Sequence, residues 1–196
     1  MKKNIIIIVY SVLLSLNIYG QTSLPLKSYK VDKSHTNIGF TISHFVISDV
    51  LGSFKDFEGT FIYSKNDFSD AKVKLTIKAS SIETNDVNRD NHLKTADFFD
   101  VAKYPTITFE SQSVKLLKGK NISIKGSITI NGVTKPITLS GIYKGEFINP
   151  MTKNTIAVFQ ITTDIVRKDF NIGLSYPTAA LGDVVKLEST VELIKE

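Results

Sequence analysis

The 196-residue chain contains no cysteine and no tryptophan, and it has only two methionines. The absence of cysteine excludes disulfides, thiolate zinc sites, iron–sulfur clusters, lipoprotein acylation and cysteine nucleophiles. Packing alone must therefore hold the core together. The length fits one β-barrel or β-sandwich domain, or at most two small domains.

Arginine is also scarce, because Arg89 and Arg167 are the only arginines among the 24 basic residues. The net charge of +5 comes from lysine. Nucleic-acid recognition favours clustered arginine forks and aromatic residues interleaved with basic ones, and the sequence has no such segment. We therefore expect no nucleic-acid partner.

The N-terminus has the order of a secretory signal peptide. Lys2 and Lys3 precede an apolar run from Ile5 to Leu16, and the small residue Gly20 follows. The run is shorter than the roughly 20 residues that a membrane span needs. We expect residues 1–20 to be removed, the protein to be periplasmic or secreted, and no stable membrane span to remain after cleavage. An uncleaved anchor is the alternative.

From Tyr29 onward, apolar and polar residues alternate with a period of two, which is typical of strands with one buried face. In the first such stretch, Ile38, Phe40, Ile42, His44 and Val46 share one face. Later stretches repeat the pattern. The residues expected to face inward there include Phe57, Phe61, Tyr63, Val73, Leu75, Ile77, Ile107, Phe109, Ile122, Ile124, Ile128, Ile130, Ile137, Leu139, Tyr143, Phe147, Ala157, Phe159, Ile161, Ile165, Val185, Leu187, Val191 and Leu193.

Two local signals punctuate this pattern. The alternation changes phase across Ser111–Ser113, which predicts a β-bulge, and Asn131-Gly132 predicts a tight turn. Residues 85–105 break the alternation and place Leu93, Ala96 and Phe99 three residues apart, which indicates a short helix.

About eight or nine strands and one helical insert favour a barrel, because closure removes exposed strand edges. We predict an all-β fold, an eight-stranded antiparallel lipocalin-like barrel with one short helical insert. Six expected inward positions are small, namely Gly59, Ala79, Gly126, Gly141, Gly145 and Ser189. Either they leave room for a slender ligand, or neighbouring Phe and Ile side chains fill the gaps.

Candidate polar residues inside the barrel are few. His44 lies on the expected inward face, either as a core histidine that is hydrogen-bonded to a neighbour or as a contact for a ligand head group. Arg89 and Arg167 have the acids Asp90 and Asp169 beside them, so each is either a structural ion pair or an anion contact.

The sequence predicts no metal site. Its three histidines lack the spacing of metal ligands. Residues 86–97 resemble a calcium loop superficially, but Asn91 replaces the glycine that such a loop requires.

Five segments together resemble the YceI-like polyisoprenoid-binding domain family. In chain order they are DKSHTNIGFTISH, LGSFKDFEG, NRDNHLKTADFFDVAKYPTITF, GSITINGVTKPITL and RKDFNIG. The resemblance covers residues 29–195, and the third segment is an unusual string that a generic barrel does not need. Two positions depart from the family pattern, with Thr36 in place of Ser and Asn171 in place of Gly.

The resemblance implies an exported lipocalin-like barrel that holds a long isoprenoid-type chain in an apolar channel. It marks Asp32, His35, Phe40, His44, Arg89, His92, Leu93, Phe98, Phe99, Tyr104, Pro105, Phe109, Gly132, Arg167, Asp169 and Phe170. Combined with the alternation, it gives the candidate ligand-binding residues Phe40, Ile42, His44, Ile77, Arg89, His92, Phe98, Phe99, Phe109, Arg167, Asp169 and Phe170.

We therefore expect a non-enzymatic binder or carrier of a long apolar lipid of the polyisoprenoid, quinone or fatty-amide type, with no cofactor besides that lipid. Two alternatives remain at this stage. One is an enzyme that acts on such a lipid with His44 or His92 as base, although no base–nucleophile–orienter set can be named. The other is an envelope scaffold with a plugged barrel. A homodimer is left open.

Overall fold

The computed structural model describes residues 24–196, so the expected signal peptide, residues 1–20, lies outside the described residues. No helix within 24–196 is long and apolar enough to cross a membrane. The strands are β1 (Lys27–Val31), β2 (Asn37–His44), β3 (Ser48–Phe54), β4 (Phe57–Tyr63), β5 (Lys72–Lys78), β6 (Ile82–Glu83), β7 (Thr106–Leu116), β8 (Asn121–Ile130), β9 (Val133–Ile148), β10 (Thr155–Val166) and β11 (Leu181–Lys195). The α-helix is α1 (Val87–Leu93), and short 3₁₀ segments span Ala79–Ser81, Lys118–Lys120 and Arg167–Phe170.

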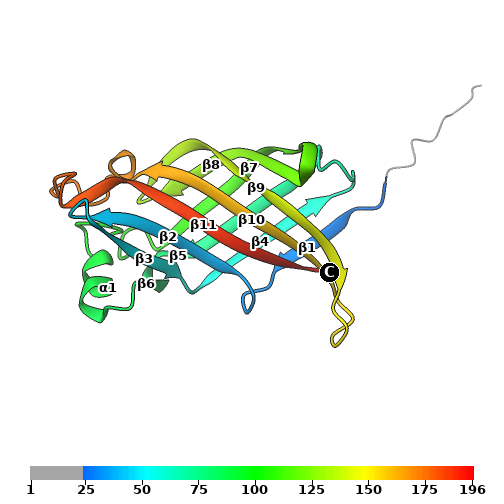
Figure 1. The fold of residues 1–196 in the computed structure, drawn as a ribbon, viewed down its shortest axis with the longest axis horizontal. Coiled ribbons are helices and arrows are strands. Elements are labelled where there is room, and N and C mark those ends of the chain that lie inside the picture. The colour runs from blue at the N-terminus through cyan, green and yellow to red at the C-terminus, as the bar shows by residue number, and fades with distance from the viewer. Residues whose placement is uncertain (1–23) are drawn as a thin grey trace, which may run out of the picture.

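The sheet closes on itself through eight antiparallel strands. The order is β1, β4, β5, β7, β8, β9, β10 and β11, and β11 pairs back to β1 through Val31↔Leu193. This confirms the predicted eight-stranded antiparallel barrel with one helical insert. The barrel is elongated, with its strands strongly tilted (Figure 1).

Three more strands lengthen the barrel at one end. Strand β2 continues the line of β1 along β11, where Asn37 pairs with Thr190. In the same way, β3 continues the line of β4, and β6 continues the line of β5. Strands β3 and β6 pair with each other through Phe54↔Ile82. Three of the eight positions in the wall are therefore each built from two strands with a break between them.

The predicted alternation places the core inside the barrel. Every second residue of β8 from Ile122 to Ile130 is buried. The bulge across Ser111–Ser113 is confirmed by a register shift against β8. The Asn131-Gly132 turn is confirmed by positive φ angles of 50° and 74°, as a tight hairpin requires.

The expected inward orientation was wrong for Val46, Gly145 and Phe147. Val46 lies in the turn after β2, where it is exposed, because β2 ends at His44. Phe147 is exposed because the pairing of β9 with β10 shifts register between Gly145 and Tyr143. A one-residue shift reverses the facing of every later side chain.

The insert between β6 and β7 lies at one end of the barrel, which we call the mouth (Figure 1). Helix α1 begins there because the Asp86 carboxylate accepts a hydrogen bond from the backbone N–H of Arg89, 3.0 Å away. This hydrogen bond also lowers the pKa of Asp86. After the helix, Tyr104 returns the chain to β7, and its ring covers Gly132 of the β8–β9 turn.

The opposite end of the barrel is filled by six aromatic side chains, the aromatic plug: Tyr29, Phe61, Tyr63, Phe68, Tyr143 and Phe159. Adjacent rings lie 4.8–6.5 Å apart, mostly edge to face or tilted. The hydroxyls of Tyr29 and Tyr63 both donate to Glu146 Oε1, at 2.9 and 2.8 Å. Burial raises the pKa of Tyr143 to about 12.

Candidate functional site

The barrel encloses a cavity of about 460 Å³ at the mouth, the outer chamber. Its walls come from β2, β3, β5, β6, β7, β8, β10 and β11, from the insert that carries α1, and from the segment between β10 and β11. Phe40 reaches this chamber from β2, and its ring lies over Gly52 of β3, where a larger residue would clash with it. The lining is apolar apart from a few polar side chains near the rim.

A second cavity of about 150 Å³, the inner chamber, continues toward the aromatic plug. Five residues line both chambers, namely Ile38, Gly39, Ile77, Ile128 and Leu187. This shared ring forms the waist between the chambers. The inner chamber ends against Phe61 and Phe159 of the plug.

The small inward residues do not create these chambers, with one exception. The ring of Phe109 covers Gly126, and Gly141 packs against the Gln160 carbonyl and the Ile161 side chain. Among the six small positions named from the sequence, Ser189 alone lines a chamber. Neighbouring side chains and backbone fill the space over Gly59, Gly126 and Gly141, and the chambers arise elsewhere along the barrel.

Ten of the twelve candidate residues line a chamber. Phe40, Ile42, His44, Ile77, Arg89, His92, Phe98, Phe99 and Arg167 line the outer chamber, and Phe109 and Ile77 line the inner one. Asp169 and Phe170 line neither. Phe170 is buried in the core, and Asp169 lies 3.8 Å from Lys135 on the surface.

Arg89 faces the outer chamber and is held by Thr84 rather than by Asp90. Its Nε donates to the Thr84 hydroxyl and its Nη2 to the Thr84 carbonyl, both at 2.7 Å. The same hydroxyl donates to Asp90 at 2.6 Å, so Asp90 orients Thr84 and Thr84 orients Arg89. Within residues 24–196, Arg89 makes no ion pair, and its Nη1 donates no hydrogen bond. The N–H groups of Arg89 Nη1 are therefore available to an anion in the chamber.

Arg167 has the opposite character, since its side chain is 1% exposed and fully bonded. Five of its six hydrogen bonds go to backbone carbonyls, those of Ile172, Gly173, Tyr176, Leu181 and Gly182. The sixth, at 3.0 Å, joins it to Asp183 instead of the sequence neighbour Asp169. The guanidinium thus organises the loop of residues 171–183 at the mouth.

The two histidines of the outer chamber lie at its rim. His44 is the last residue of β2 and is exposed, so the expected mid-strand burial was wrong. Its ring lies 4.4 Å from that of Phe45. His92 on α1 contacts Asp97 at 3.1 Å and packs edge to face on Phe98.

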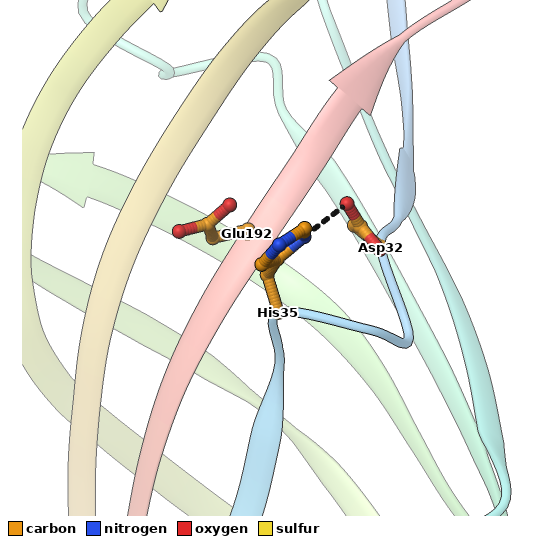
Figure 2. Close-up of side chains that lie close together, drawn as sticks. All are labelled: Asp32, His35 and Glu192. Atoms are coloured by element: carbon orange, nitrogen blue, oxygen red, sulfur yellow. Dashed lines mark hydrogen bonds and ion pairs between the residues drawn. The ribbon is translucent and has the colours of Figure 1, made fainter. Parts of the chain in front are cut away.

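A further polar cluster lies where the wall breaks between β1 and β2 (Figure 2). His35 Nδ1 lies 2.9 Å from Asp32 Oδ2, and Glu192 of β11 lies beside them; each of the three offers a potential metal-ligating atom within 4.8 Å of the others. The backbone and hydroxyl of Ser34 also donate to Asp32. These hydrogen bonds account for the arrangement as a brace of the loop. They lower the pKa of Asp32 and, through the Asp32 contact, raise the pKa of His35.

Both departures from the family pattern fit their positions. Asn171 has a φ of 57°, a left-handed conformation that asparagine tolerates better than most residues. Thr36 keeps the hydroxyl of the serine it replaces, and this hydroxyl bonds to both the N–H and the carbonyl of Glu192.

Sequence reasoning missed Thr84, Phe45 and Tyr176, which also line the outer chamber. Thr84 is buried just after the two-residue strand β6, where no periodic pattern marks it. Tyr176 lies in an irregular loop, which period-two arguments cannot place.

Comparisons with known proteins agree with this geometry. A family model described as YceI-like domain matches residues 29–193. Protein YceI of Salmonella agona (strain SL483) is 40% identical over 174 residues, which are 88% of each chain. The crystal structure of the Campylobacter jejuni YCEI protein is 34% identical, with a TM-score of 0.70 over 84% of this chain and 96% of that one. A polyisoprenoid binding domain from Saccharophagus degradans is 14% identical, with a TM-score of 0.65 over 86% and 98%, and is similar in fold alone.

Arg167→Lys is expected to destabilise the protein by about 3 kcal/mol or more, because lysine cannot satisfy the buried carbonyls and Asp183 together. Lys168 reaches the same carboxylate from a more exposed position, so Lys168→Gln should cost less than about 1 kcal/mol. Urea denaturation of both variants measures the difference. Equal stability of the two would show that the buried guanidinium is dispensable.

Asp32→Asn is expected to lower the pKa of the His35 imidazole toward its ordinary value. His35 stabilises the fold fully below about pH 6.5, and this contribution is lost as pH rises through its raised pKa. Asp32 stabilises above about pH 4, and its contribution is lost as pH falls through its lowered pKa. The brace is therefore strongest between these values. Nuclear magnetic resonance titration of the three histidines measures the shift, and Asp97→Asn is the control that should leave His35 unchanged.

Proposed function

Because the chain belongs to the YceI-like domain family, we propose that it is an exported carrier that holds a lipid with a long apolar tail and a polar head group. The two chambers take the tail, and the head group lies at the mouth beside Arg89. The structural neighbour from Saccharophagus degradans is described as a polyisoprenoid binding domain, which supports a polyprenyl chain as the tail.

The shape and chemistry of the chambers support the tail assignment. The two chambers follow one another along the barrel, meet at the waist and end at the aromatic plug. A slender, unbranched or methyl-branched chain fits such a space better than a compact ligand. Burial of apolar area contributes about 25 cal/mol per Å², so a chain of fifteen or more carbons gains several kcal/mol without any polar contact.

Arg89 supports an anionic head group such as a phosphate. It is the cation at the chamber whose donors remain available within residues 24–196, while those of Arg167 are bonded to the protein. The link from Asp90 through Thr84 fixes the guanidinium before a ligand arrives. A quinone or a fatty amide, which carries no charge, would gain less from this contact.

Binding accounts for the geometry better than the two alternatives. Within the described residues, no hydroxyl is hydrogen-bonded to the side chain of His44 or His92, so a nucleophile activated by either base is not assembled. A plugged scaffold needs a filled axis, whereas this barrel is filled at the aromatic plug and hollow along the rest. The proposal further places the protein in the periplasm, in line with the N-terminal signal pattern.

Arg89→Gln is expected to weaken binding of a prenyl phosphate about ten- to a hundredfold. A charge-assisted hydrogen bond contributes roughly 1.5–3 kcal/mol, and each 1.4 kcal/mol is a factor of ten. Binding of the matching prenyl alcohol should change little. Titration of both ligands by calorimetry measures this difference.

The control for this experiment is Arg89→Lys, which keeps the charge and should retain part of the preference for phosphate over alcohol. If Arg89→Gln leaves both affinities at the wild-type value, the head group does not contact Arg89. If neither ligand binds the wild-type protein, the carrier proposal itself is wrong.

Ser189→Phe is expected to fill the inner chamber and to shorten the longest tail that binds. Ser189 lines this chamber from β11, so a phenyl ring there should weaken binding of a C20 prenyl chain more than that of a C10 chain. The neighbouring Thr190 faces solvent, so Thr190→Phe is the matched control. An equal loss of affinity for the C10 and C20 chains would show that the tail does not enter the inner chamber.

A further inference from the structure

The turn between β2 and β3 exposes three consecutive apolar side chains. Phe45, Val46 and Ile47, which we call the apolar tip, are 59%, 74% and 91% exposed. No charged residue occurs from Ser43 to Ser48. Single exposed apolar residues are common on protein surfaces, but a run of three is unfavourable for solubility unless it has a function.

The backbone of the tip is also unfavourable for these residues. Phe45 and Val46 have φ angles of 49° and 66°. A β-branched residue at positive φ is a true outlier, and glycine or asparagine would relieve the strain. Valine therefore occupies a position where neither folding nor solubility favours it, and a role for the apolar side chain in binding would account for this.

The tip adjoins the entrance to the outer chamber. The backbone N–H of Phe45 donates to the Ala180 carbonyl at 3.0 Å, which fixes the tip to the opposite loop of the rim. The Phe45 side chain lines the chamber as well as being exposed. The apolar surface of the chamber therefore continues to the tip. Helix α1 at the same end of the barrel (Figure 1) carries a further exposed apolar residue, Val87.

We propose that the apolar tip inserts into the surface of a lipid bilayer, so that a lipid passes between the bilayer and the outer chamber without crossing water. This inference rests on the proposed function. A bilayer suits the tip better than a protein partner, because a stable protein interface buries about 800 Å² on each side, whereas interfacial insertion scales with the apolar area buried and needs no matching partner surface. The tip is uncharged, so docking should depend little on anionic lipid.

The absence of tryptophan makes the contact directly measurable. Ile47→Trp introduces the single indole of the chain at the tip. Its emission should shift to shorter wavelength, and brominated lipid should quench it, when vesicles of phosphatidylethanolamine and phosphatidylglycerol, or of phosphatidylcholine alone, are added. Met151, which is 87% exposed in the β9–β10 turn, gives the matched control Met151→Trp at the far end, which should show neither change.

A second variant tests the role of the apolar side chain. Val46→Asp should not impair folding, because aspartate tolerates positive φ better than valine. In the Ile47→Trp background it should lower vesicle binding on the order of tenfold. Loading with a prenyl phosphate from donor vesicles should slow similarly, while affinity for the same lipid dispersed without vesicles stays at the wild-type value.

The outcomes separate this inference from the proposed function. If prenyl phosphate binds but Ile47→Trp shows no shift with vesicles, the docking inference is overturned and the carrier proposal stands. If the shift occurs but no prenyl lipid binds, the carrier proposal fails. An equal or larger shift for Met151→Trp, or a shift that depends on protein concentration without vesicles, overturns docking by the tip in favour of non-specific adsorption or self-association.

Discussion

Strand β11 pairs with β1 through Leu193 and with β2 through Thr190, so one strand closes the eight-stranded ring and also carries its extension at the mouth. Closure leaves no free edge in the ring, and each side chain on the inner face must then meet others across the barrel. The break at residues 32–36 allows β1 and β2 to follow the same neighbour in succession. The Asp32–His35 contact, together with Thr36 bonded to Glu192, holds this break against β11. This arrangement lengthens the wall beyond β1, and β2 supplies Ile38, Phe40 and Ile42 to the outer chamber.

The sequence predicts the wall of the barrel well, because strand periodicity is a local property. Each residue of a strand faces opposite to its neighbours whatever the rest of the chain does, so β8 and β10 could be assigned from alternation alone. The Asn131-Gly132 turn and the bulge at Ser111–Ser113 are equally local. The chemistry of a few residues and the phase of the pattern determine both.

The features that escaped prediction depend on contacts distant in sequence. Phe147 points outward because the chain shifts register at Gly145, and the pairing with β10 decides this shift. Arg167 pairs with Asp183 and not with the adjacent Asp169, since the loop between them folds back over the guanidinium. Whether a glycine leaves empty space likewise depends on which distant side chain packs against it. The ring of Phe109, for example, fills the space over Gly126. The residues that line the chambers were thus largely predictable, whereas the roles of the two arginines were not.

Apolar burial alone cannot make this barrel selective, because every long hydrocarbon tail gains about the same free energy per unit of buried area. If the chambers hold a tail as proposed, its length would be sensed at the waist and at the plug, where Phe61 and Phe159 end the inner chamber. A charged head group would be sensed at the mouth, where Arg89 lines the outer chamber. Arg89 and the apolar tip stand at the same opening. A lipid drawn from a bilayer keeps its head group at the interface, so a guanidinium beside the entrance would contact that head group before the tail has fully entered. For a carrier of the proposed kind, selection by charge and uptake of the tail would be consecutive steps at one end of the molecule, and the far end would need only to stay closed.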